Sequence, residues 1–166
     1  MIAEKLYLVG FMASGKSTVA RAIARRLGWQ KADIDELIEQ REHMTVADIF
    51  AKRGEPYFRA AERAVLLAQL GTRHVIVATG GGTFVDPVNR DAINRDGVSV
   101  WLDVPLAKVI ARVPADGRRP LAADRAAFEA LYQARREAYQ LASIRLDAGG
   151  ASVDALVEEL LDRLNA

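Results

Sequence analysis

The chain has 166 residues, of which 51% are hydrophobic and 27% are charged, a balance typical of one globular domain with its own core. Its 23 Lys and Arg against 22 Asp and Glu give a net charge of +1, which excludes the basic footprint expected of a nucleic-acid-binding or membrane-surface protein. The absence of cysteine excludes disulfides and thiolate chemistry, and two histidines disfavour a zinc site built from several imidazoles.

Strands and helices are expected to alternate along the chain, because short apolar runs are separated by segments with apolar residues at helical spacing. In chain order, we predict a strand at 5–10, a helix at 16–27 ended by Gly28, a strand at 29–35, and helical pieces over 36–70 with breaks near Thr45 and at "RGEP". There follow a strand in "HVIVAT", a helix at 89–97, a strand at 98–104, helices at 106–112 and 126–141, a strand at 143–148 and a Ser-capped helix at 152–164.

This alternation predicts a three-layer α/β/α fold, with a five-stranded parallel sheet covered on both faces, in a single domain spanning residues 1–166. The irregular polar stretch at about 113–125 is long enough to form a lid. The first apolar run is too short to cross a membrane and leads into "SGKST" rather than a cleavage site. We therefore expect a cytoplasmic monomer that binds neither nucleic acid nor membranes.

The stretch "GFMASGKST", residues 10–18, fits the phosphate-loop pattern G-x-x-x-x-G-K-[ST] and lies between a predicted strand and a predicted helix. Its glycines let backbone amides turn inward and form an anion nest with the helix N-terminus. Lys16 would reach the β- and γ-phosphates, and the Ser17 hydroxyl would bind Mg²⁺. The expected nucleotide is ATP, and its predicted ligands in the loop are Gly10, Ala13, Ser14, Gly15, Lys16, Ser17 and Thr18. A glycine turn with a coincidental Lys-Ser is the structural alternative.

Three further stretches should lie at the carboxyl ends of the strands, where ligands bind in open α/β sheets. In "DID", Asp33 and Asp35 would share one face of a strand, one holding a water on Mg²⁺ and the other accepting a proton from a hydroxyl; helix-capping aspartates are the alternative. In "RGEPYFRAAE", Arg59 precedes Glu62 by three residues, and a surface ion pair is the simpler explanation. The glycines of "ATGGG" indicate either backbone close to a substrate or a tight turn.

Taken together, "GFMASGKST", "DIDELIE", "IFAKRGEPYFRAAE", "VIVATGGG", "VWLD" and "RRPL" resemble the shikimate kinase family in kind and in order, from Leu6 to about Asp147. The GE-x-x-FR-x-x-E and ATGGG elements are much more specific than the phosphate loop. The resemblance implies a phosphate-loop NTPase fold of the nucleoside monophosphate kinase type, with an acceptor-binding helical segment at about 34–62. It also implies that the protein uses ATP and Mg²⁺ to phosphorylate the 3-hydroxyl of shikimate, a small cyclic carboxylic acid.

The resemblance assigns roles to the residues that match its motifs. Asp35 would hold the ring hydroxyls and help deprotonate the attacking one, and Arg59 would pair with the carboxylate. Asp33 would reach Mg²⁺ through a water, Arg119 of "RRPL" would contact the phosphates from the lid, and Arg112 would stack on adenine. The substrate pocket would be lined by Phe50, Phe58, Gly80, Gly81 and Gly82. The catalytic residues would be Asp35, Lys16 and Arg119.

The chain departs from the family pattern in three places. A second carboxylate-binding arginine is expected in a pattern like R-x-P-L-Y, but here Glu137 and Ala138 replace the Pro-Leu in "ARREAY". Arg135 is the expected ligand, and Arg136 is a competing candidate. The phosphate loop has Ala13 where a glycine is common in this family, and the lid is short.

Two other functions remain open from the sequence. Another small-molecule kinase of the same fold, such as a gluconate kinase or a nucleoside monophosphate kinase, would share the phosphate loop, and gluconate also carries a carboxylate for Arg59. A regulatory module that has lost chemistry should lack at least one of Lys16, Ser17, Asp33, Asp35 and the lid arginine, and all five are present. Shikimate is therefore the expected small-molecule substrate.

Overall fold

The computed structural model describes residues 3–112 and 125–165. In chain order the elements are β1 (Lys5–Val9), α1 (Lys16–Leu27), β2 (Gln30–Asp33), α2 (Ile34–Glu42), α3 (Val46–Gln69), β3 (Val75–Ala78), the 3₁₀ helix η1 (Thr83–Val85), α4 (Pro87–Asp96), β4 (Val98–Asp103), α5 (Leu106–Arg112), α6 (Arg125–Tyr139), β5 (Ile144–Asp147) and α7 (Val153–Leu164). The strands form one parallel sheet in the order β2-β3-β1-β4-β5.

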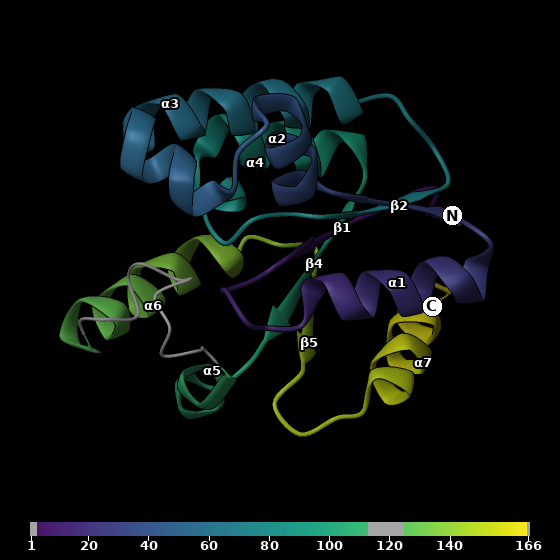
Figure 1. Cartoon of the computed structure of the whole chain (residues 1–166). Helices are drawn as coiled ribbons and strands as arrows, with labels where there is room; N and C mark the ends of the chain where they lie inside the picture. Colours follow the sequence, from purple (N-terminus) through teal and green to yellow (C-terminus); the bar gives the residue numbers. More distant parts are fainter. Residues whose placement is uncertain (1–2, 113–124, 166) are drawn as a thin grey trace.

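Helices cover both faces of this sheet (Figure 1). α2, α3 and α4 lie on one face, and α1 and α7 lie on the other. The arrangement confirms the predicted three-layer α/β/α fold with a five-stranded parallel sheet. No helix in the part of the chain that the structure describes is both long and apolar enough to cross a bilayer. Because all strands run the same way, their carboxyl ends meet at one edge, where the loops after β1, β2, β3 and β4 come together.

The central strands are buried on both faces, which explains their continuous apolar runs. Three strand residues interrupt these apolar runs with a buried polar or charged side chain: Lys5 of β1, and Ser99 and Asp103 of β4. Lys5 is only 1% exposed. It forms an ion pair with Asp96 of α4 at 2.6 Å, and Asp96 also accepts hydrogen bonds from Tyr7 Oη at 2.7 Å and from the Gly71 amide at 3.0 Å. Burial of the lysine is therefore compensated by a paired carboxylate that itself has several donors.

Several predicted boundaries agree with the structure. α1 ends at Leu27, and Gly28 follows it in the left-handed conformation with φ 69°. Thr45 caps α3 by accepting a hydrogen bond from the Asp48 amide. The break at "RGEP" is a kink inside α3, where Gly54 has φ 83° and ψ 168°.

The predicted strand at 29–35 is wrong at its end. β2 stops at Asp33, whose carboxylate accepts a hydrogen bond from the Glu36 amide at 3.1 Å and so caps α2. Asp35 consequently lies in the first helical turn, and the two aspartates do not share one face of a strand. The predicted lid at 113–125 lies outside the described residues except for Arg125, which begins α6.

Candidate active site

The phosphate loop connects β1 to α1 and is shaped by two glycines. Gly10 has φ 149°, and a Cβ there would lie 2.9 Å from the carbonyl oxygen of Leu102, so the position requires glycine for both conformation and space. Gly15 has φ 93° and directly precedes α1. Lys16 Nζ donates to the carbonyl oxygens of Gly10 and Phe11, each at 2.8 Å. The lysine therefore lies folded over the loop whose amides would receive a phosphate.

Ala13 of this loop adopts the left-handed conformation, with φ 60°. This conformation costs a residue with a Cβ about 1–2 kcal/mol, which explains why glycine suits the position. The Ala13 carbonyl accepts a hydrogen bond from Arg112 Nη1 at 3.3 Å, so the last residue of α5 reaches the phosphate loop. Arg119, the expected lid arginine, lies outside the described residues.

Ser17, in the first turn of α1, contacts Asp33, at the carboxyl end of β2. The Ser17 hydroxyl donates to Asp33 Oδ2 at 2.6 Å, while Asp33 Oδ1 caps α2. Mg²⁺ in kinase sites is bound by one or two protein oxygens together with waters and substrate phosphates. A hydroxyl and a carboxylate this close, next to the phosphate loop, fit that requirement.

Three charged side chains converge on the three glycines that follow β3. A Cβ on Gly80 would lie 2.8 Å from Asp35 Oδ1, one on Gly81 would lie 2.8 Å from Arg135 Nη1, and one on Gly82 would lie 2.5 Å from Arg59 Nη1. None of these glycines has a positive φ, so a left-handed turn is not what requires them. The triplet instead leaves space for one carboxylate and two guanidinium groups that come from α2, α3 and α6.

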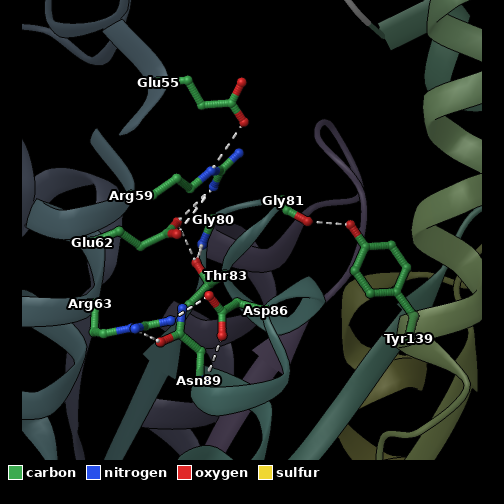
Figure 2. Close-up of polar contacts among 10 residues, drawn as sticks. All are labelled: Glu55, Arg59, Glu62, Arg63, Gly80, Gly81, Thr83, Asp86, Asn89 and Tyr139. Atoms are coloured by element: carbon green, nitrogen blue, oxygen red, sulfur yellow. Dashed lines mark hydrogen bonds and ion pairs between the residues drawn. The ribbon is translucent and has the colours of Figure 1, made fainter. Parts of the chain in front are cut away.

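A hydrogen-bonded chain holds Arg59 at this place (Figure 2). Arg59 Nη1 contacts both carboxylate oxygens of Glu62, at 3.1 and 3.3 Å, and Thr83 Oγ1 donates to Glu62 Oε2 at 2.9 Å. Thr83 in turn accepts from the Gly80 amide at 3.0 Å. The sequence favours a surface pair for Arg59 and Glu62, but Glu62 is only 1% exposed. The pair therefore links α3 to the glycine triplet.

The two consecutive arginines of α6 point to different partners. Arg135 faces Gly81 and lies over the Phe11 ring, 5.7 Å from its centroid. Burial lowers the pKa of Arg135, and the nearby charge of Arg59 lowers it further. Arg136 instead forms an ion pair with Asp103 at 2.5 Å, and this hydrogen bond raises its pKa. Of the two candidates, Arg135 is the one that faces the glycine triplet.

Aromatic side chains complete the surroundings. The rings of Phe50 and Phe58 pack with their centroids 4.7 Å apart, and the guanidinium of Arg59 lies 5.3 Å from the Phe58 centroid. Tyr139 donates from Oη to the Gly81 carbonyl at 2.5 Å, a contact drawn in Figure 2, and burial raises its pKa well above the ordinary value. The described structure thus places Phe58 against Arg59 with Phe50 packed on Phe58, and it attaches α6 directly to the glycine triplet.

Sequence reasoning missed three residues that connect this cluster: Thr83, Tyr139 and Asp103. Thr83 directly follows the glycines, and its hydroxyl was the only local indication of a role.

Arg59 and Glu62 also line a cavity of about 340 Å³ with Ala60, Arg63, Asp86 and Asn89. Asp35 and Arg135 do not line this cavity, so it adjoins the cluster without containing it.

The chain matches the family model described as shikimate kinase over residues 12–165. A shikimate kinase of Persephonella marina is 40% identical to it over 162 residues, which cover 97% of this chain and 99% of that protein. The structure of shikimate kinase from Acinetobacter baumannii in complex with shikimate has a TM-score of 0.91 at 30% identity, covering 98% of this chain and 93% of that one. Shikimate kinase from Aquifex aeolicus has a TM-score of 0.89 at 32% identity, covering 97% and 96% of the two chains. The phosphate-loop fold of the nucleoside monophosphate kinase type is thereby confirmed. The chain belongs to the shikimate kinase family.

Proposed function

We propose that this protein transfers the γ-phosphoryl group of ATP to the 3-hydroxyl of shikimate. The observation that supports this most is the convergence of Asp35, Arg59 and Arg135 on three successive glycines. Gly81 at the middle of the triplet lies against the phosphate loop, since a Cβ there would be 3.6 Å from the Met12 amide nitrogen. A small acceptor with one carboxylate and several hydroxyls matches two guanidinium groups and one carboxylate.

In this proposal each side chain performs one part of a phosphoryl transfer. Arg59 and Arg135 bind the acceptor carboxylate, which orients the ring, and Asp35 accepts the proton of the attacking hydroxyl. Lys16 exchanges the loop carbonyls of Gly10 and Phe11 for phosphate oxygens. Positioning and charge neutralisation account for most of the catalysis in such reactions.

The nucleotide side of the site is proposed to contain Mg²⁺. When bound, the ion neutralises charge on the phosphates, and Ser17 would hold it directly while Asp33 would act through a water. Arg112 would stack on adenine from the end of α5, next to the phosphate loop. We keep Arg119 as the proposed lid ligand of the phosphates. We also propose that the protein acts as a monomer, which light scattering with activity measured across dilution would test.

A substrate panel tests the proposal against the gluconate kinase alternative. Purified protein with Mg-ATP should release ADP with shikimate, and release should stay near background with gluconate or a nucleoside monophosphate. Quinate, a related ring acid, measures how strictly the ring is recognised. Asp35→Asn protein purified in the same way serves as the control for contaminating kinases, because it replaces the proposed proton acceptor with a side chain of the same shape. Clear turnover with gluconate and none with shikimate would refute the assignment.

A further inference from the structure

Asp103 lies at the carboxyl end of β4, where two arginines enclose its almost fully buried carboxylate. Arg136 of α6 contacts Oδ1 through Nη1 at 2.5 Å and Oδ2 through Nη2 at 3.4 Å. Arg145 of β5 contacts Oδ2 through Nε at 2.8 Å and Nη2 at 2.7 Å. Both guanidiniums also lie over the Trp101 ring, at 4.8 and 5.6 Å from its centroid. The cluster therefore ties α6 to the β4–β5 edge of the sheet.

The same face of α6 carries two more anchors. Tyr132 Oη donates to the Val104 carbonyl at 2.7 Å and accepts from Arg136 Nη1 at 3.1 Å. Two turns after Tyr132, Tyr139 Oη donates to the Gly81 carbonyl at 2.5 Å. Tyr132, Arg136 and Tyr139 are spaced by four and three residues, so they form one stripe along the helix. Contacts at three points of one stripe fix the rotation of α6 about its own axis.

That rotation decides where Arg135 points, because it is adjacent to Arg136 on the helix and about 100° around it. With the stripe held on β4 and the glycine loop, the Arg135 guanidinium lies at Gly81 and over Phe11. Arg136 and Arg145 both form ion pairs with Asp103, so neither of them points to the glycine triplet.

We propose that Asp103 and Arg136 form a positioning pair, whose ion pair holds α6 so that Arg135 points at the carboxylate of the acceptor. The inference rests on the proposed function, because it concerns how the acceptor carboxylate is bound. It predicts that the pair affects binding of the carboxylate-bearing substrate without touching it. The nucleotide site should be unaffected, since Ser17 and Asp33 contact one another, and neither contacts the pair among the interactions of the described residues.

Steady-state kinetics of Arg136→Gln, which removes the ion pair but keeps a polar side chain, test the inference. We expect the KM for shikimate to rise at least fivefold, with kcat and the KM for ATP within twofold of the wild type. Arg136→Lys, which retains a charge for Asp103, should recover most of the loss. The matched control is Arg145→Gln, which removes the other partner of Asp103 without releasing α6 and should leave the shikimate KM within twofold.

A double-mutant cycle separates positioning from a general structural role. In an Arg135→Met background, adding Arg136→Gln should raise the shikimate KM by no more than twofold, because the guanidinium that it aims is gone. An equal rise in both backgrounds, an unchanged KM in the single variant, or a joint loss of kcat and of both KM values would overturn the inference. If Arg136→Gln does not fold, Arg136→Met, which also removes the ion pair with Asp103, takes its place in the cycle and is judged by the same criteria. A wild-type protein that does not use shikimate would refute the proposed function, which is a separate result.

Discussion

Gly82→Ala should weaken shikimate binding while leaving the fold intact. Gly82 has φ −100° and ψ −7°, a backbone conformation open to alanine. The new Cβ would lie 2.5, 2.7 and 2.8 Å from three atoms of the Arg59 guanidinium. Ordinary contact between such atoms requires about 3.5 Å, so the guanidinium must move by roughly 1 Å. The backbone tolerates the change, but Arg59, the proposed ligand of the acceptor carboxylate, must move.

The size of the effect follows from what the displacement removes. A hydrogen bond to a charged group contributes about 1.5–3 kcal/mol, and a shift of roughly 1 Å spoils the alignment of a bidentate pair. A loss of about 1.4 kcal/mol corresponds to a tenfold rise in the KM for shikimate, and complete loss of the contact to about 100-fold. The free energy of unfolding should fall by no more than about 3 kcal/mol, because the narrower unfolded ensemble offsets part of what the displaced Arg59–Glu62 pair loses.

The assay is the shikimate KM at saturating ATP, with ADP release as the readout and urea unfolding as the stability measurement. Gly150→Ala is the matched control, because its Cβ would have no neighbour closer than 3.9 Å. Gly80→Ala, which crowds Asp35 instead, should lower kcat more than it raises KM. A Gly82→Ala protein with wild-type KM would show that Arg59 does not bind the acceptor from its observed position.

Three further outcomes follow from the same structure. Asp35→Asn should lower kcat by about 100-fold or more with a smaller change in the shikimate KM, because a positioned base contributes about 10²–10⁴; a larger effect on KM than on kcat would assign Asp35 to binding alone. Ala13→Gly should raise the free energy of unfolding by about 0.5–1 kcal/mol, since relief of about 1–2 kcal/mol of left-handed strain outweighs the added entropy of the unfolded chain; chemical denaturation would reveal a decrease if this reasoning fails. Burial raises the pKa of Asp96, but hydrogen bonds from Lys5, Tyr7, Gly71 and Arg73 outweigh it and hold this pKa well below its usual range. The contribution of the Asp96 carboxylate to the free energy of unfolding is complete above its unfolded pKa of about 3.9 and is lost as the pH falls below that value. Between pH 6 and pH 2, the free energy of unfolding should therefore decrease less in Asp96→Asn than in the wild type.

The sequence predicted the scaffold of the site well because its elements are locally determined. The helix over 16–27 has both a clear apolar periodicity and a glycine stop, and its observed bounds agree. The strand through "DID" failed because two local rules compete there. Alternation favours a strand, but a carboxylate three residues before a free amide caps a helix, and the capping contact of Asp33 prevailed.

The parts of the site that the sequence could not settle depend on partners far away along the chain. Glu62 is buried because Thr83, 21 residues later, provides it with a hydrogen bond. The choice between Arg135 and Arg136 depends on Asp103, more than 30 residues earlier, which occupies one of them. Adjacent arginines on a helix look alike in a sequence, and only the arrangement of the opposing strand distinguishes them.

Arg59 lies close enough to Arg135 for its charge to lower the pKa of Arg135, although the chain as a whole carries a net charge of only +1. These two like charges repel one another even though Glu62 pairs with Arg59, and an anion between them relieves that repulsion. Any small anion in the buffer is therefore a competitor for the acceptor. Chloride, sulfate or phosphate should raise the apparent KM for shikimate in proportion to their concentration, beyond general ionic screening. The choice of counterion in storage and assay buffers is therefore part of any comparison of acceptor affinities for this protein.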